Sequence, residues 1–134
     1  MKLLLDTHIL LWALADDPKL PIKARSMIED EKHDVYFSLL SLWEIEIKHL
    51  LHPDRMKTDA GKVRHYCLDA GYRALSLRAD HILYLKKLSR AENSPPHKDP
   101  FDRMLICQAC TEDMLLLTHD ELLRDYEESS VFLV

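Results

Sequence analysis

The sequence contains only two glycines in 134 residues, and this scarcity excludes several kinds of nucleotide site. Glycine-rich phosphate loops need glycine where the backbone approaches the phosphates closely. Neither G-x-G-x-x-G nor G-x-x-x-x-G-K occurs in the chain. No apolar run approaches the roughly 20 residues that cross a bilayer, and the apolar start at 1–5 is too short for a signal-peptide core. We therefore expect a soluble, cytoplasmic protein with no membrane partner.

Cysteine is also scarce, with only Cys67, Cys107 and Cys110 present. An odd number of thiols forms no disulfide framework and suits a reducing compartment. Cys107 and Cys110 have C-x-x-C spacing, but they fall well inside a helix predicted from Pro100 onward, whereas a redox pair needs a helix N-terminus. A zinc site would need further ligands, and no second cysteine pair exists. We interpret all three as small core residues.

Hydrophobic residues make up 47% of the chain, which is enough for one core, so we expect a single domain over residues 1–134. The net charge of −5 disfavours nonspecific nucleic-acid binding through bulk electrostatics. It does not disfavour a metal-dependent nuclease, whose acids are neutralised when metal binds. The stretch 48–68 is basic, and it is either a solvated helix face or a rim for a phosphate backbone. Its candidate phosphate contacts are Lys48, Arg55 and Lys57.

Short apolar runs alternate with helical patterns along the chain, which is typical of an α/β fold with a parallel sheet. We predict a loop at 90–98, because its Asn-Ser-Pro-Pro run suits neither a helix nor a central strand. Ser41 precedes Glu44 at the capping-box interval, which predicts a helix start at Ser41. The predicted strands are 2–5, 35–38, 74–77, 114–118 and 131–134, and the predicted helices are 8–15, 21–30, 41–51, 59–70, 79–88, 100–112 and 121–127.

Four carboxylates lie where these predicted elements begin or end. Asp6 and Asp120 follow the strands at 2–5 and 114–118, while Glu44 and Asp102 lie in the first turns of helices. Ligands of open α/β sheets bind beyond the carboxyl ends of the strands, so the four acids have a plausible shared cleft. Carboxylate oxygens suit Mg²⁺ or Mn²⁺, which bind phosphate. In such sites one ion activates water, and a second, about 3.5–4 Å away, stabilises the leaving oxygen.

Each acid also has a purely structural interpretation. Asp6 and Asp120 can cap the helices that follow them, and Glu44 can form an exposed pair with Lys48. Asp99 suits the N-cap of a helix with Pro100 at N1, which leaves Asp102 in the favourable first turn.

Three neighbouring side chains are candidates to assist the acids. The Arg103 guanidinium could position a carboxylate or a phosphate. Thr118 can donate its hydroxyl to a carboxylate or a water. His119 could act as an acid or base, although we expect its side chain to point away from the acids. We expect Trp12 and Trp43 to be core or interface residues.

Together these segments resemble the PIN domain, and in particular the VapC-like toxins of prokaryotic toxin–antitoxin pairs. The resemblance is carried by Leu4-Leu5-Asp6-Thr7-His8, Ser41-Leu42-Trp43-Glu44-Ile45, His97-Lys98-Asp99-Pro100-Phe101-Asp102-Arg103 and Leu117-Thr118-His119-Asp120. It implies a three-layer α/β/α fold with a mainly parallel sheet. It also implies an endoribonuclease that uses one or two Mg²⁺ or Mn²⁺ ions and leaves 5′-phosphate and 3′-hydroxyl ends. The family's catalytic and metal-binding acids fall on Asp6, Glu44, Asp102 and Asp120, with Asp99 and Thr118 as auxiliary residues.

The resemblance further implies an RNA substrate, a homodimer and a small cognate antitoxin. Candidate contact surfaces are the apolar side of 9–14 and the helix around Trp43. Two other functions stay open: a noncatalytic binding module and a receiver-like phosphoacceptor domain. The receiver needs an acidic pair after the first strand and a late lysine, and this chain has neither. A dehalogenase-type phosphatase would need D-x-D, where this chain has Asp6-Thr7-His8.

Overall fold

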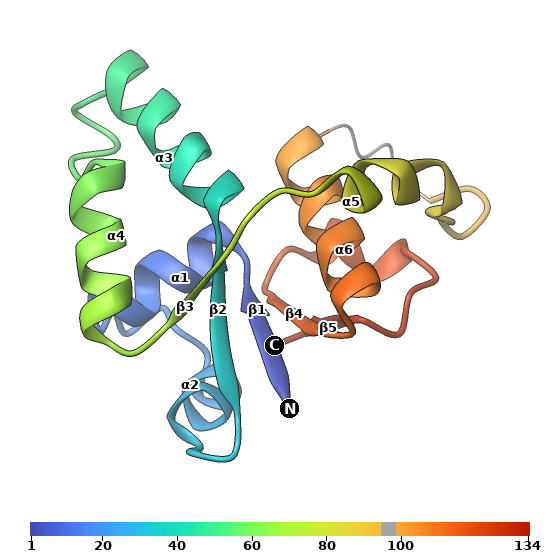
Figure 1. Cartoon of the computed structure of the whole chain (residues 1–134), viewed down its shortest axis with the longest axis horizontal. Coiled ribbons are helices and arrows are strands. Elements are labelled where there is room, and N and C mark those ends of the chain that lie inside the picture. The colour runs from blue at the N-terminus through green and yellow to red at the C-terminus, as the bar shows by residue number, and fades with distance from the viewer. Residues whose placement is uncertain (95–98) are drawn as a thin grey trace.

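The structure is a computed structural model, and it describes residues 1–94 and 99–134. Its five strands form one sheet in the order β3-β2-β1-β4-β5, and every neighbouring pair is parallel. The predicted mainly parallel α/β architecture is therefore confirmed (Figure 1). The strands are β1 (Lys2–Leu5), β2 (Asp34–Ser38), β3 (Arg73–Leu75), β4 (Leu115–Thr118) and β5 (Val131–Leu133).

Helices fill the connections between the strands. Helices α1 (Thr7–Leu14) and α2 (Ile22–Glu29) join β1 to β2, and α3 (Leu39–Leu51) and α4 (Ala60–Asp69) join β2 to β3. The long return to β4 contains α5 (Ala79–Leu83), the 3₁₀ helix η1 (Tyr84–Lys87) and α6 (Pro100–Glu112), and η2 (Glu121–Asp125) precedes β5. In the described part of the chain, no helix is long and apolar enough to cross a membrane.

Three local predictions need correction. Helix α3 begins at Leu39 rather than at Ser41, because Ser38 is its N-cap and accepts a hydrogen bond from the backbone N–H of Leu40. The helix predicted at 79–88 is split into α5 and η1, and the one predicted at 121–127 is a 3₁₀ helix. Of the predicted loop at 90–98, Pro95–Lys98 lie outside the described residues, as do the motif residues His97 and Lys98.

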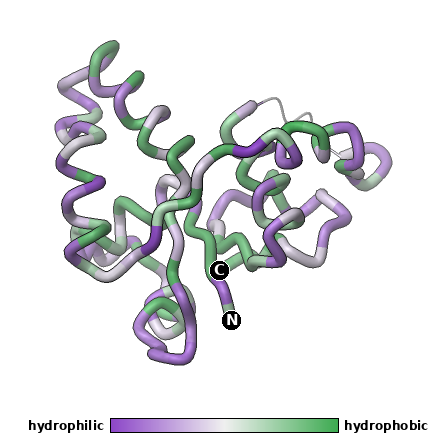
Figure 2. The backbone as a smooth tube through the Cα atoms, viewed as in Figure 1, coloured by the Kyte–Doolittle hydropathy of each residue, from purple (hydrophilic) through white to green (hydrophobic). Residues whose placement is uncertain are grey.

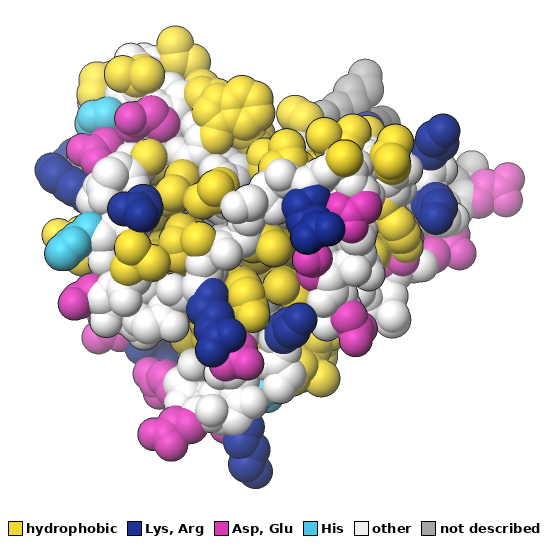
Figure 3. Space-filling model, in the orientation of Figure 1, with side chains coloured by type: hydrophobic (Ala, Val, Ile, Leu, Met, Phe, Trp, Pro, Cys, Tyr) yellow, Lys and Arg dark blue, Asp and Glu magenta, His cyan; other side chains and the backbone are white. Residues whose placement is uncertain are grey.

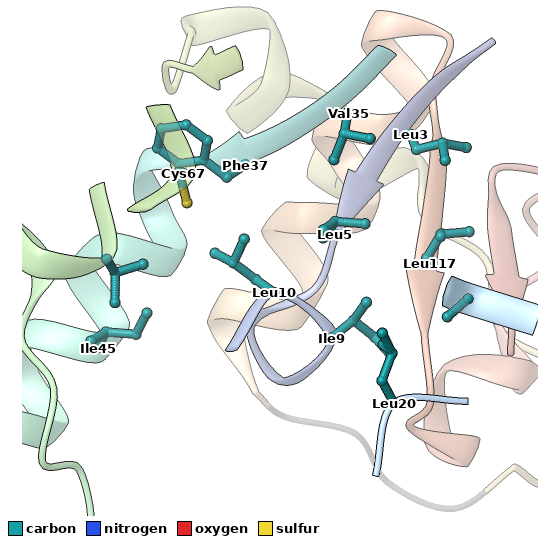
Figure 4. Close-up of a cluster of buried hydrophobic side chains, with 12 residues drawn as sticks. Leu3, Leu5, Ile9, Leu10, Leu20, Val35, Phe37, Ile45, Cys67 and Leu117 are labelled. Carbon is teal, nitrogen blue, oxygen red and sulfur yellow. The ribbon is translucent and has the colours of Figure 1, made fainter. Parts of the chain in front are cut away.

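The alternation of strand side chains divides the hydrophobic core into two halves. Leu3 and Leu5 pack with residues of α1, α2, α3 and α4 (Figure 4), whereas Leu4 packs with residues of α6 and η2. The sheet is therefore the middle of three layers, with α1–α4 on one side and α5 and α6 on the other (Figure 1). Figure 2 shows the hydrophobic stretches of β1 and β4 in the middle of the molecule. Burial of each such leucine contributes about 1.5–3 kcal/mol to folding.

The order of the strands creates one position in the sheet where a ligand site is expected. From β1 the chain builds outward through β2 to β3, then returns to the other side of β1 with β4 and β5. The carboxyl ends of β1 and β4 therefore flank the point where the direction of strand addition reverses, which is where open α/β sheets bind ligands. The backbone N–H of Asp6 donates to the carbonyl of Leu117 at 3.1 Å. This bond holds the end of β1 beside Thr118.

Candidate active site

Asp6 lies at this reversal point and is buried, as its position between two apolar segments predicted. Its side chain is only 4% exposed and caps α1 by accepting a hydrogen bond from the N–H of Ile9 at 2.8 Å. Burial raises the pKa of Asp6, and the nearby Asp120 charge raises it further. Hydrogen bonds from Thr118 and Ile9, together with the charge of His8, lower this pKa. Asp6 is therefore both the N-cap of α1 and a buried carboxylate.

Glu44 is held on α3 by contacts from two helices. It is 5% exposed. The ion pair with Lys48 does form, but the structural interpretation of Glu44 as part of a solvent-exposed pair is wrong, because Glu44 is buried. The hydroxyl of Thr7 donates to Glu44 Oε1 at 2.8 Å, and Thr7 Oγ1 also lies 3.0 Å from the Ser41 hydroxyl. A buried carboxylate is costly unless it is paired and hydrogen-bonded, and Glu44 has both kinds of partner.

As their spacing predicted, Asp99 caps α6 and Asp102 lies in the first turn of that helix. Asp99 is the N-cap of α6 and accepts from the backbone N–H groups of Phe101 and Asp102, with Pro100 in the first turn. Asp102 is partly buried in that turn. Burial, followed by the charges of Asp99, Asp6, Glu44 and Asp120, raises the pKa of Asp102 to about 7. A carboxyl with this pKa is half protonated near neutrality and gives up its proton readily to a cation.

Asp120 and Thr118 are connected to Asp6 by a short relay of hydrogen bonds. Asp120 is partly exposed and caps η2 by accepting from the N–H of Leu122 at 2.9 Å. Its own backbone N–H donates to Thr118 Oγ1 at 3.1 Å. Thr118 in turn hydrogen-bonds to the Asp6 carboxylate. The hydroxyl of Thr118 therefore helps to fix the position of the Asp6 carboxylate.

Asp6, Glu44, Asp102 and Asp120 are called the acidic quartet below. The other three all act on the pKa of Asp102, which places their charges within electrostatic range of that residue. Within the described ranges 1–94 and 99–134, no three His, Cys, Asp or Glu side chains already form a ready coordination shell. The donor chemistry nevertheless fits Mg²⁺ or Mn²⁺, because these ions prefer carboxylate oxygens. A divalent cation would also relieve the repulsion that raises the Asp102 pKa.

Two pockets adjoin the acids. The first, called the acidic pocket, has a volume of about 280 Å³ and is lined by Asp6, His8, Trp12, His119 and Asp120. The second, called the basic pocket, has about 270 Å³ and is lined by His8, Lys48, His52, Arg55 and Met56. His8 lines both. A larger apolar pocket of about 580 Å³ lies over α1 and α4, has Arg55 and Lys57 among its lining residues, and contains none of the acidic quartet.

Sequence reasoning missed His8 and Trp12 as site residues. They are four residues apart and so lie on the same side of α1, with ring centroids 5.9 Å apart. That spacing, directly after Asp6, was the available signal. The His119 side chain was expected to point away from the acids, yet its ring lines the acidic pocket, with its centroid 6.1 Å from that of Trp12. Its Nδ1 lies 2.6 Å from the backbone oxygen of Val134.

The remaining candidates are three basic residues. Arg55 and Lys57 are exposed and have no ion-pair partner among the described residues. Arg103 contacts Tyr126: burial raises the pKa of the Tyr126 phenol, while the charge of Arg103 and its hydrogen bond lower it.

The cysteines match their predicted core role. Cys67 and Cys107 are buried, and burial raises their thiol pKa values to about 12 and about 11. Cys110, which is only partly buried, also has a raised pKa because of burial. Since the thiolate is the reactive form, these thiols are unreactive at neutral pH.

A family model described as the PIN domain matches residues 3–129. The chain belongs to the PIN domain family. PIN domains are generally nucleases, so membership supports a nuclease activity for a chain that carries the acidic quartet.

Solved structures share the fold at low sequence identity. A chain of VapBC2 from Rickettsia felis, bound to a DNA fragment from its promoter, aligns over 100% of this PIN domain and 98% of its own length, with a TM-score of 0.66 and 15% identity. A chain of VapBC-1 from nontypeable Haemophilus influenzae aligns over 93% and 94%, with a TM-score of 0.58 and 17% identity. A comparison with curated protein sequences finds no match. These likenesses support the predicted α/β/α fold.

Proposed function

We propose that this PIN domain is a Mg²⁺- or Mn²⁺-dependent endoribonuclease that hydrolyses RNA phosphodiester bonds. The observation that supports the proposal is the electrostatic coupling of four carboxylates near the reversal point of the sheet: burial is the main cause that raises the Asp102 pKa to about 7, and the charges of Asp99, Asp6, Glu44 and Asp120 add to it. Perturbed acids in one cleft are typical of functional sites. A structural role alone would favour separating these charges.

In this proposal the four acids share one task, and neighbouring residues orient them. Asp6, Glu44, Asp102 and Asp120 would hold one or two divalent ions. When bound, the metal would polarise the scissile phosphate and lower the pKa of a water. The α1 cap and Thr118 orient Asp6, while Thr7 and Lys48 orient Glu44. Asp102, whose pKa of about 7 leaves it half protonated near neutrality, would give up its proton when it holds the cation.

In this proposal the basic residues of the two neighbouring pockets supply the phosphate contacts. Lys48 lines the basic pocket together with Arg55, and Arg55 also lines the apolar pocket with Lys57. Their charges offset the net charge of −5 at the place where a polyanion must approach the acids. Arg103, which points to Tyr126, is given a supporting role on α6 rather than a phosphate contact.

We further propose that the protein is the toxin of a VapBC-type pair, with a small antitoxin and a second copy of itself as partners. Support comes from the fold that it shares with VapBC complexes and from its exposed apolar surface. Figure 3 shows hydrophobic side chains gathered over the start of α3 and over α5. The large apolar residues exposed in this region are Leu39 (39%), Trp43 (59%), Ile82 (49%) and Leu83 (64%). Large apolar side chains gathered on one face are typical of a protein-binding surface.

The receiver-like alternative is disfavoured by topology. Receiver domains have the strand order 2-1-3-4-5, whereas this sheet has β3-β2-β1-β4-β5. A noncatalytic binding module remains the second candidate, and the experiment below separates it from a nuclease.

The test uses the purified chain with total bacterial RNA and with Mg²⁺, Mn²⁺ or chelator, and cut sites are mapped by primer extension. We expect metal-dependent cleavage at defined sites, with 5′-phosphate ends. Asp6→Asn and Asp102→Asn should lower the rate at least about 100-fold, a loss typical of groups that act on transition-state charge. Asp54→Asn, which removes the same charge from an exposed position, serves as the matched control. Cleavage by Asp6→Asn at the parental rate would refute the assignment, and metal-dependent RNA binding without cleavage would favour the noncatalytic module.

A further inference from the structure

The acidic pocket has a feature that metal binding does not require. Besides Asp6 and Asp120, it is lined by three rings, those of His8, Trp12 and His119. Trp12 is the centre of this group, with His8 at 5.9 Å and a 37° tilt and His119 at 6.1 Å in an edge-on arrangement. The three rings come from α1 and from the segment after β4, so the sheet order brings them together. They are called the aromatic wall below.

We propose that the aromatic wall binds an unstacked nucleobase of the RNA beside the scissile phosphate. The proposal rests on the nuclease function proposed above and identifies how its substrate is held. Sequence-tolerant binding of single-stranded RNA commonly combines base stacking on aromatic rings with a basic groove for the backbone. Both elements are present and adjacent here, because His8 lines the acidic pocket and also the basic pocket with Lys48, His52 and Arg55.

Charge complementarity favours a nucleotide over an acidic peptide as the occupant. The acidic pocket is also lined by Asp6 and Asp120, which would repel a carboxylate side chain but accept a neutral base next to a cation-bridged phosphate. The cationic side chains lie one pocket further along, at Lys48 and Arg55, where the next phosphates of a strand would pass. Trp12 is partly buried and packs against the core beneath it. Its ring is therefore held in place before a base arrives.

The chain offers a direct optical test, because Trp12 and Trp43 are its two tryptophans. Trp43→Leu leaves Trp12 as the sole fluorophore, and Trp12→Leu leaves Trp43, which is 59% exposed and contacts Phe101 outside the acidic pocket. Each chain is titrated with a short single-stranded oligoadenylate RNA, with Ca²⁺ in place of Mg²⁺ to slow cleavage. We expect saturable quenching of Trp12 and none of Trp43. Quenching of neither fluorophore, or of both equally, would overturn the proposal.

A cleavage experiment gives the second readout. An RNA containing a mapped cut site is made with an abasic nucleotide on either side of that site. Removal of the stacked base should slow wild-type cleavage about 5- to 150-fold, since a base–aromatic stack is worth that factor. In Trp12→Leu this abasic penalty should fall toward one, whereas Trp12→Phe and Trp43→Leu should retain most of it.

The penalty is a ratio within one protein variant, so it is insensitive to a general loss of folding or activity. An equal abasic penalty in wild type and Trp12→Leu would show that Trp12 does not hold a base. The two proposals can also fail separately. Absence of metal-dependent cleavage would refute the nuclease but leave the quenching test readable. Normal cleavage without Trp12 quenching would refute the base site alone.

Discussion

Replacement of Asp102 by asparagine should make the metal-free protein more stable at neutral and alkaline pH while it abolishes activity. The pKa of Asp102 rises from an ordinary 3.8 to about 7 in the folded chain, with burial as the main cause and the other carboxylates adding to it. The charged form is therefore unfavourable in the fold. Asparagine keeps the size of the side chain and removes this charge.

The magnitude follows from proton linkage. Between pH 5 and pH 7 the unfolded chain has lost the Asp102 proton, but the folded chain retains it. The unfolded state then binds fewer protons than the folded state, so the free energy of unfolding falls as pH rises. Two pH units at about 1.4 kcal/mol each give about 3 kcal/mol as an upper limit. Partial solvent exposure screens the effect, and we expect about 1–2 kcal/mol.

The assay compares thermal unfolding of the metal-free wild type and Asp102→Asn at pH 5 and pH 8 in chelator. The stability advantage of the variant should grow by about 1–2 kcal/mol over this range, or about 4–8 °C in Tm for a chain of this length. The other ionisable groups are the same in both proteins, so the comparison isolates the contribution of residue 102. Saturating Mn²⁺ should reverse the order at pH 8, because ligand binding stabilises the wild type more. Parallel pH profiles, or a variant less stable than wild type at pH 8, would refute the reasoning.

Three further outcomes are expected. Calorimetric titration with Mn²⁺ should show about tenfold tighter binding at pH 8 than at pH 6, because binding displaces the Asp102 proton; a flat profile would contradict the pKa of about 7. Thr7→Val removes the hydroxyl that donates to buried Glu44 and should lower the urea-derived free energy of unfolding by about 1–3 kcal/mol. Thr111→Val, which removes only a bond to the Cys107 carbonyl, is the comparison and should cost less. Asp120→Asn should lower kcat/KM about 10-fold under saturating Mn²⁺, which is a smaller loss than that of Asp6→Asn, because Asp120 is more exposed and better solvated. An equal loss in kcat/KM for the two variants would contradict this ranking of the two acids.

The fold and the positions of the acids could be predicted because both depend on local patterns. Apolar runs separated by helical periodicity predicted all five strands of the sheet, and an acid after an apolar run predicted a buried Asp6. The start of α3 could not be predicted in the same way. Ser38 and Ser41 are both reasonable caps, and the choice depends on the burial of Ser41 against Thr7, a residue 34 positions away. Local preference is overridden by such contacts.

The aromatic wall was missed for the same physical reason. His8 and Trp12 are neighbours on α1, but the contact of Trp12 with His119 exists only because β4 pairs directly with β1. The order of strands in a sheet is a nonlocal property, and alternation patterns do not encode it. An apolar helix containing a tryptophan therefore indicated a core or interface position, which accounts for the packing of Trp12 but not for its share in the acidic pocket.

Capping and metal binding are compatible roles in this site, although the sequence presents them as alternatives. Asp6 and Asp120 each use Oδ1 to accept a backbone N–H at a helix start. A carboxylate has a second oxygen with further lone pairs, so the cap fixes the direction of the group and leaves it able to bind a cation. The positive end of α1 also offsets part of the cost of burying the Asp6 charge. A helix start directly after a strand thus delivers an oriented anion to the carboxyl edge of the sheet. The same construction, repeated after β1 and β4, brings acids far apart in sequence to the edge of the same pocket.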